Sequence, residues 1–249
     1  MLLAIDVGNT QTVFGLFEGP ELREHWRVAT EAHRTGDEVG LLLRGLVDVS
    51  TLEGICLAST VPPLIRSYEE LAEGVGTALL VVGPGTRTGI PVRYDDPREV
   101  GPDRIANAVA ANERHGAPCI VVDFGTSTNF DVVSPEGEYV GGVLAPGIEV
   151  SMDALFQRAA RLFEVDFAEP PTVIAKTTAA SLQSGLVYGF AGQVDGIVER
   201  IRGELGEEAQ TVATGGLADL IVPHARTLER VDPFLTLEGL RLIWERNRD

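Results

Sequence analysis

The sequence predicts an α/β protein built from two similar halves, and three observations carry that prediction. Short apolar runs typical of β-strands precede helix-like segments in residues 1–115, and the same order returns in residues 116–249. In each half an apolar run ends in an acid, and we expect a glycine and a threonine at the same offsets after it, from Asp6 in the first half and from Asp123, 117 residues later, in the second. A period this long does not fit a solenoid repeat. We therefore expect two homologous α/β domains, 1–115 and 116–249, with a ligand site in a cleft between them.

The first half opens with strands and continues with helices. Two apolar runs around a Gly-Asn-Thr turn predict the first two strands, and a more polar run predicts a third. Apolar residues at helical spacing predict helices, the last of which has a proline in its favoured first turn. The expected strands are 2–7, 12–17, 21–29, 55–59 and 78–82, the expected helices are 36–48, 62–74 and 102–114, and the Gly- and Pro-rich stretch 83–96 is expected to be a loop.

The second half repeats this order with longer helices. An apolar run again ends in an acid and a small-residue turn, and a second apolar run follows. The tail has the apolar spacing of an amphipathic helix. The expected strands are 119–123, 129–133, 138–144 and 210–213, and the expected helices are 150–162, 179–203, 217–220 and 236–247.

Composition limits the classes of function. The chain of 249 residues has a formal net charge of −17, so it repels phosphate backbones and nucleic acid is not an expected partner. No apolar run approaches the roughly 18 residues of a membrane span, and no basic stretch precedes Leu2 and Leu3, so we expect neither membrane insertion nor a signal peptide. Cys56 and Cys119 lie in apolar runs and predict buried thiols in a reducing compartment. The four histidines show no metal-ligand spacing, which argues against zinc chemistry.

The repeated turn has the chemistry of a phosphate site. A glycine directly after a strand allows a ligand to approach the backbone, and exposed amides there form a concavity that binds anions. Thr10 and Thr126 add hydroxyl donors, whereas Asp6 and Asp123 repel phosphate unless a cation lies between them. Together these groups predict a metal-bridged phosphate cradle, one half from each domain. The alternative is an ordinary hairpin turn, in which such residues serve backbone geometry alone.

Two other glycine-rich turns are ambiguous. The stretch from Gly83 to Gly89 lacks the Gly-Lys-Ser/Thr ending of a P-loop, and an ordinary surface or lid loop explains it better. Thr214-Gly215-Gly216 follows a strand, where it could let an adenine or ribose lie against the backbone. A tight strand-to-helix connection explains it equally well.

Three further residues, Asp103, Arg104 and Tyr94, have both a structural and a functional interpretation, whereas the spacing around Thr178 gives only a structural one. Asp103 in the first turn of a helix favours the helix dipole, but it could also aim a carboxylate at a substrate hydroxyl. Arg104 could hold a polar or carboxylate group of a substrate, or it could be a surface arginine paired with an acid. Thr178 is a plausible helix N-cap, and Tyr94 could pack in a loop or contact a ligand.

Taken together, these motifs closely resemble the type III pantothenate kinases over nearly the whole chain. The most specific part is the stretch 93–104, because the two acid-Gly-Thr turns alone indicate only the superfamily of actin, sugar kinases and heat-shock chaperone ATPases. The motifs that carry the resemblance are Asp6-Val7-Gly8-Asn9-Thr10, Gly83-Pro84-Gly85, Tyr94, Pro97-Arg98-Glu99-Val100-Gly101-Pro102-Asp103-Arg104, Asp123-Phe124-Gly125-Thr126, Pro146-Gly147, Thr177-Thr178 and Thr214-Gly215-Gly216.

The resemblance implies a duplicated ribonuclease-H-like fold that binds ATP between its domains and phosphorylates pantothenate, the first step of coenzyme A synthesis. It implies magnesium, a monovalent cation (potassium or ammonium), a homodimer and a cytoplasmic location. Asp103 would accept the proton, Asp123 would bind the monovalent cation, and Asp6 would help to organise magnesium. The resemblance also assigns ATP binding to Asp6, Val7, Gly8, Asn9, Thr10, Gln11, Thr12, Val13 and Thr126, and pantothenate binding to Tyr94, Gly101, Pro102, Asp103, Arg104 and Thr178.

Gln11, Ser127 and Asn129 depart from the residues common in that family. They are small polar exchanges that bear on nucleotide affinity and not on the reaction. Two alternatives stand beside the kinase interpretation. One is a catalytically idle member that acts as a regulator, against which the intact Asp103 argues. The other is a different phosphotransferase or phosphatase of the superfamily, such as an acetate or polyphosphate enzyme, against which the stretch 93–104 argues.

Overall fold

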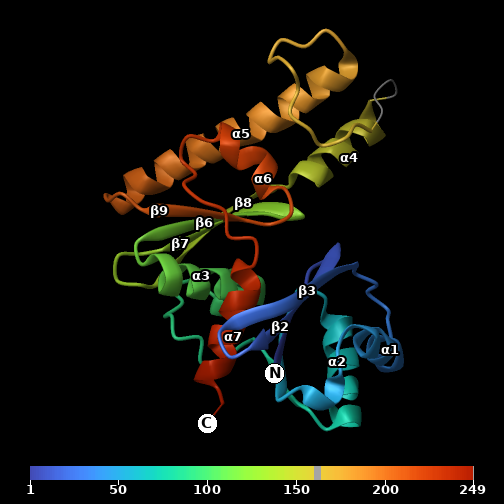
Figure 1. The fold of residues 1–249 in the computed structure, drawn as a ribbon. Helices are drawn as coiled ribbons and strands as arrows, with labels where there is room; N and C mark the ends of the chain where they lie inside the picture. The colour runs from blue at the N-terminus through green and yellow to red at the C-terminus, as the bar shows by residue number, and fades with distance from the viewer. Residues whose placement is uncertain (160–163, 249) are drawn as a thin grey trace. The chain divides into compact units, whose positions relative to one another are not determined.

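The computed structural model describes residues 1–159 and 164–248, which form two compact units (Figure 1). The first unit is Met1–Ala110 together with Leu235–Asp249, and the second is Ala111–Phe234. The division expected from the sequence follows the chain and assigns the last helix to the second half. In space that helix belongs to the first unit, because its apolar face packs on the sheet of the first unit.

The first unit contains a five-stranded mixed sheet. Strands β1 (Leu2–Val7), β2 (Gln11–Glu18) and β3 (Glu21–Ala29) form an antiparallel meander, and β4 (Gly54–Ser59) and β5 (Ala78–Val81) run parallel to β1. The strand order is β3-β2-β1-β4-β5. Parallel neighbours need a crossover connection. Helix α1 (Gly36–Leu46) lies between β3 and β4 in the chain, and α2 (Pro62–Val75) lies between β4 and β5.

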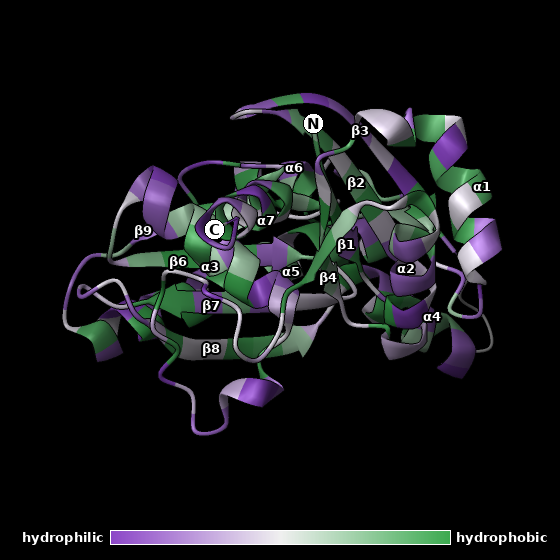
Figure 2. Ribbon diagram, turned by 90° about the horizontal axis from the view of Figure 1, so that it is seen from below, coloured by the Kyte–Doolittle hydropathy of each residue, from purple (hydrophilic) through white to green (hydrophobic). Residues whose placement is uncertain are grey.

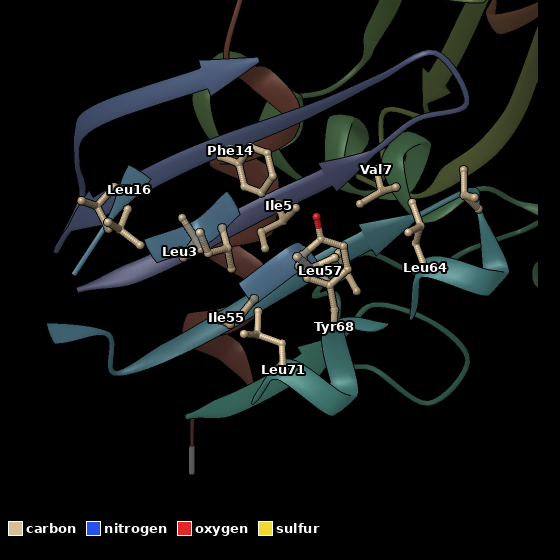
Figure 3. Packing of buried hydrophobic residues seen from close by; sticks show 14 residues of the cluster. Leu3, Ile5, Val7, Phe14, Leu16, Ile55, Leu57, Leu64, Tyr68 and Leu71 are labelled. Carbon is tan, nitrogen blue, oxygen red and sulfur yellow. The ribbon is translucent and has the colours of Figure 1, made fainter. Parts of the chain in front are cut away.

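Side-chain alternation divides the first sheet into two buried faces. Leu3, Ile5 and Val7 point to one face, where they pack with Tyr68 of α2 (Figure 3). Leu43 of α1 belongs to the same cluster. The intervening residues of β1, Asp6 among them, point to the other face. That face is covered by α7 (Leu235–Arg246), whose contacts are with β1, β4 and β2.

The second unit repeats the connectivity of the first. Strands β6 (Cys119–Phe124), β7 (Ser127–Val133) and β8 (Tyr139–Pro146) form an antiparallel meander, and β9 (Gln210–Thr214) runs parallel to β6, in the order β8-β7-β6-β9. This order matches β3-β2-β1-β4 of the first unit. The duplication expected from the sequence is therefore present in the topology.

Long helices cover the second sheet. Ile120, Val122 and Phe124 of β6 pack with Val194 and Val198 of α5 (Thr178–Leu205). Helix α4 (Ile148–Arg158) precedes α5, the short α6 (Ala218–Ile221) follows β9, and α3 (Pro102–His115) connects the two units along the chain. Hydrophobic residues concentrate on strands such as β6 and β7 (Figure 2), whereas the edge strand β3 is mostly polar and exposed.

The expected elements are present, with ends that differ by a few residues. Strand β7 begins at Ser127, two residues before the expected start, because polar residues that continue a ladder carry no apolar pattern. The expected helix 150–162 corresponds to α4, which begins at Ile148 and ends at Arg158, and residues 160–162 lie outside the described part of the chain. Cys56 and Cys119 are buried free thiols, as expected, and burial raises the pKa of each to about 12. In the part of the chain that the structure describes, no helix has the length and apolar character needed to span a membrane.

Candidate active site

The two acids of the repeated turn occupy equivalent places in the two units. Asp6 and Asp123 are each the penultimate residue of the first strand of their sheet. Each lies beside a parallel strand that ends at the same edge, where Asp6 pairs in register with Ala58 and Asp123 with Thr214. Ligands of α/β proteins bind at the carboxyl ends of parallel strands. The fold therefore positions both acids where a ligand is expected.

The two turns differ in length by one residue. The Gly8 amide donates to the Gln11 carbonyl at 3.0 Å, whereas the Gly125 amide donates to the Ser127 carbonyl at 3.1 Å. The second turn therefore spans one residue fewer. The equal offsets expected for the two threonines are wrong, and Thr10 and Thr126 are not equivalent positions. Both threonines are exposed, as an interaction with a ligand requires.

Two threonines from other segments hold the first turn. The Thr30 hydroxyl donates to the Gly8 carbonyl at 2.8 Å and lies 2.8 Å from the hydroxyl of Thr12, which is itself buried. The Thr60 amide and hydroxyl both donate to the Val7 carbonyl, at 3.0 and 3.2 Å. These contacts fix the carbonyl side of the turn and leave the side chains of residues 9–11 exposed. Thr30 and Thr60 are not predictable from the sequence, because nothing in their local sequence indicates which distant turn they reach.

Three glycine-bearing turns meet around the second acid. The Gly147 amide donates to the Thr126 carbonyl at 3.2 Å, and a Cβ at residue 147 would lie 2.6 Å from the Gly125 carbonyl oxygen. Gly215, with φ +92°, lies equally close: its Cβ would be 2.6 Å from Asp123 Oδ1 and 2.6 Å from the Phe124 carbonyl oxygen. The motifs at 123–126, 146–147 and 214–216 thus form one cluster.

Oxygen atoms line this cluster. A carboxylate oxygen of Asp123 and the carbonyl oxygen of Phe124 both border the space that a Cβ at residue 215 would fill. Hard cations prefer oxygen donors of these kinds. The first turn offers one carboxylate, Asp6, which is enough for magnesium, because that ion keeps several waters and binds through one or two carboxylates plus substrate phosphates. Within residues 1–159 and 164–248, no group of three or more candidate metal-ligating side chains occurs.

Asp103 has the environment of a reactive carboxylate. It lies in the first turn of α3, where the Ile105 amide donates to the Gly101 carbonyl at 3.2 Å. Its Oδ1 atom is buried and has no hydrogen-bond partner among the described residues. Burial raises the pKa of the Asp103 carboxyl, and the backbone N–H groups of Arg104 and Asp103 and the Arg104 charge offset only part of that rise. A helix-dipole role alone would lower the pKa, so burial and not the helix dipole dominates the electrostatics of this carboxyl.

The other expected substrate residues lie in different surroundings. Arg104 is buried, with 7% of its surface exposed, which excludes the alternative of a surface arginine. A Cβ on Gly101 would overlap Asp103 Oδ1, so the glycine leaves room for that oxygen. Tyr94 is half-buried in the loop before α3. Thr178 is exposed at the start of α5 and is not the N-cap: Thr177 is, because its hydroxyl accepts the Ala180 amide at 3.2 Å.

The loop that follows β5 is tied to the C-terminal helix. The Arg87 amide donates to Asn247 Oδ1 at 3.1 Å, and Asn247 Nδ2 donates to the Arg87 carbonyl at 2.9 Å. Arg246 adds a hydrogen bond to the Thr88 carbonyl. The stretch 83–89 is therefore a loop that the C-terminal end of the chain holds in place.

Comparison with known proteins places these observations in a family. A model of the type III pantothenate kinase family matches residues 2–200. The chain is similar to a protein of Acidothermus cellulolyticus named type III pantothenate kinase, with 56% identity and 99% of each chain covered.

Two solved structures share the fold. A Campylobacter jejuni protein named as a Baf family transcriptional activator has a TM-score of 0.64 at 18% identity, with 98% of each chain covered. A Listeria monocytogenes protein named as an N-acetylmannosamine kinase has a TM-score of 0.55 at 11% identity, with 100% of this chain and 99% of the other covered. Together with the repeated sheets, these likenesses confirm the expected α/β fold of two ribonuclease-H-like domains.

Proposed function

The chain belongs to the type III pantothenate kinase family, and on that premise we propose how its residues carry out the reaction of that family. The reaction transfers the γ-phosphoryl group of ATP to the terminal hydroxyl of pantothenate, the first step of coenzyme A synthesis. The hydroxyl oxygen forms the new bond to phosphorus, the bond to the ADP oxygen breaks, and the hydroxyl proton must be removed. Such a transition state is loose and needs positioning and charge stabilisation more than a strong base.

The observation that carries the proposal is the buried Oδ1 of Asp103, which has no hydrogen-bond partner among the described residues. A buried carboxylate oxygen without a hydrogen-bond partner is available to accept a hydrogen bond from the substrate hydroxyl, and then its proton. Its raised pKa makes it a stronger base than an exposed aspartate. Asp103 is thus the proposed proton acceptor.

The neighbouring residues bind the two substrates. Arg104 supplies a buried positive charge for the carboxylate of pantothenate. Tyr94, Gly101, Pro102 and Thr178 complete the pantothenate site, as the resemblance of these motifs implies. The turn from Asp6 to Val13 binds ATP phosphates through backbone amides and the exposed side chains of residues 9–11, and Thr126 contacts ATP in the second turn.

Two cations assist binding. Asp6 is the proposed protein ligand for magnesium, which neutralises phosphate charge when bound. Asp123, supported by the oxygen-lined space beside Gly215, is the proposed site for potassium or ammonium. A chain with net charge −17 repels an anionic nucleotide. A cation held at each of these two sites would offset that repulsion.

The activity test measures ADP release from ATP and magnesium, with and without pantothenate and with and without potassium. Wild-type protein is expected to release ADP only with pantothenate, and faster with potassium. Asp103→Asn is expected to lower kcat by about 10²–10⁴-fold, the usual contribution of a positioned general base. The matched control is Asp37→Asn, which neutralises an exposed acid in the first turn of α1 and should keep wild-type kcat.

Each contrary result has one meaning. Wild-type turnover by Asp103→Asn would mean that this residue only interacts with the helix dipole and is not the proton acceptor. The proposed kinase activity would still be supported. Absence of pantothenate-dependent turnover with any nucleotide or monovalent ion would overturn the activity itself and favour the idle regulator.

The resemblance also implies a homodimer in the cytoplasm, where ATP is available. The second unit exposes several large apolar side chains that a second copy could cover: Leu144, Val150, Leu155, Val173 and Ile174. Light scattering coupled to size exclusion should give twice the chain mass of 26.6 kDa. A monomer at micromolar concentration would contradict this proposal.

A further inference from the structure

Helix α7 contacts α3 one turn after Asp103. The Thr236 hydroxyl donates to Asn107 Oδ1 at 2.7 Å, and Asn107 is fully buried. Asn107 follows Asp103 by four residues, so the two lie on the same face of α3, about 6 Å apart along the axis. A contact at Asn107 therefore fixes the rotation of α3 about its own axis. That rotation decides the direction in which the Asp103 side chain leaves the helix.

A second contact brings the two helix backbones together. A Cβ on Gly239 would overlap the carbonyl group and Cα of Ala106. Only glycine permits this approach, which leaves α3 no room to move toward α7. Gly239 and Thr236 are three residues apart, so they present one face of α7 to consecutive residues of α3, Ala106 and Asn107.

Helix α7 is itself firmly held by the first sheet. Leu237 packs against Gly15 of β2, and Trp244 fills the space above Gly54 of β4. Arg241 is buried and pairs with Glu238 and Glu245, each at 2.6 Å. A helix anchored in these ways can serve as a fixed support for α3.

We propose that Thr236 and Gly239 are positioning residues that hold α3 so that Asp103 meets the substrate hydroxyl. The inference rests on the proposed role of Asp103 as proton acceptor. Neither residue touches substrate. Their effect passes through Asn107 and Ala106 to the first turn of α3, and displacements of about 1 Å in a catalytic group are enough to lower the rate by one or two orders of magnitude.

Thr236→Val is the deciding variant, since it removes the hydroxyl without adding volume, whereas Gly239→Ala would force two backbones apart and endanger folding. Thr236→Val is expected to lower kcat about tenfold, to leave KM for ATP unchanged and to shift the pH dependence of kcat. Thr236→Ser keeps the hydroxyl and should restore kcat to within about twofold. The matched control is Thr211→Val, which removes a buried hydroxyl that donates to the Thr227 carbonyl at 2.6 Å and has no contact with α3 in the described hydrogen bonds.

Three results would overturn the proposal. The first is a Thr236→Val enzyme with wild-type kcat and pH dependence, whatever its stability. The second is an equal loss of kcat in Thr211→Val, which would indicate that the loss comes from general destabilisation of the fold and not from the contact with α3. If the wild-type protein shows no pantothenate-dependent turnover, the proposed function has failed, and this is visible before any variant is made. The positioning role is then tested by carbon-13 NMR titration of the Asp103 carboxyl. The third contrary result is an identical titration in wild type and Thr236→Val.

Discussion

Gly215 lies directly against Asp123, so that any side chain at residue 215 would begin 2.6 Å from Asp123 Oδ1. The backbone of Gly215 has φ +92°, a conformation that residues with a Cβ rarely adopt. Both space and conformation therefore require glycine here. The sequence left this turn ambiguous, and its position beside Asp123 favours a role in the ligand site over a simple strand-to-helix connection.

The first prediction concerns Gly215→Ala. The positive φ alone should destabilise the protein by about 1–2 kcal/mol, and the overlap with Asp123 should displace the carboxylate. We expect a several-fold rise in KM for ATP and a weaker response to potassium. Urea denaturation and ADP release at varied potassium measure the two effects.

Gly206→Ala is the control for backbone strain. Gly206 caps α5 with φ +70° and has open space around its Cβ position. It should lose similar stability but keep wild-type KM and potassium response. Equal kinetic losses in both variants would mean that strain, and not contact with Asp123, explains the result.

The sequence was sufficient for the repeated parts of the fold. Short apolar runs predicted the strands of both sheets, and the acids near the strand ends marked the edge where a ligand is expected, because both patterns are local. The long-range contacts that hold those parts in place were not predictable. Thr30 reaches Gly8 across 22 residues and Thr236 reaches Asn107 across 129, and neither has a local motif. The position of the last helix on the first sheet likewise depends on close approaches such as that of Trp244 to Gly54.

The second prediction concerns the support of the first turn. Thr30→Val removes the hydroxyl that donates to the Gly8 carbonyl and contacts Thr12. The turn should become less ordered, and KM for ATP should rise about three- to tenfold, the equivalent of one hydrogen bond of about 1 kcal/mol. Thr30→Ser should behave as wild type. An unchanged KM in Thr30→Val would show that the Gln11–Gly8 backbone contact and Thr60 suffice to hold the turn.

The third prediction concerns the loop 83–89, which precedes Tyr94 and is held in place by hydrogen bonds to Arg246 and Asn247. Asn247→Ala removes both hydrogen bonds to Arg87, so residues 83–90 should exchange amide hydrogens faster. If the loop helps to position Tyr94, KM for pantothenate should rise while KM for ATP stays constant. Arg248→Ala, which loses an exposed ion pair with Glu53, is the control and should change neither. Faster exchange with unchanged KM for pantothenate would separate the loop from the substrate site.

The fourth prediction is the pH dependence of stability in Asp103→Asn. Burial raises the pKa of Asp103 in the folded protein above its ordinary value of 3.8, so between these two values the folded state binds more protons than the unfolded state. Stability from this group is therefore full below pH 3.8 and is lost as pH rises through the folded pKa. Asparagine carries no charge at any pH and escapes that loss. Asp103→Asn should accordingly be more stable than wild type at neutral pH and equal to it at strongly acid pH, as urea denaturation across this range would measure. If the variant were instead less stable at neutral pH, as Asp37→Asn should be by a few tenths of a kcal/mol, the favourable helix dipole would outweigh burial at Asp103.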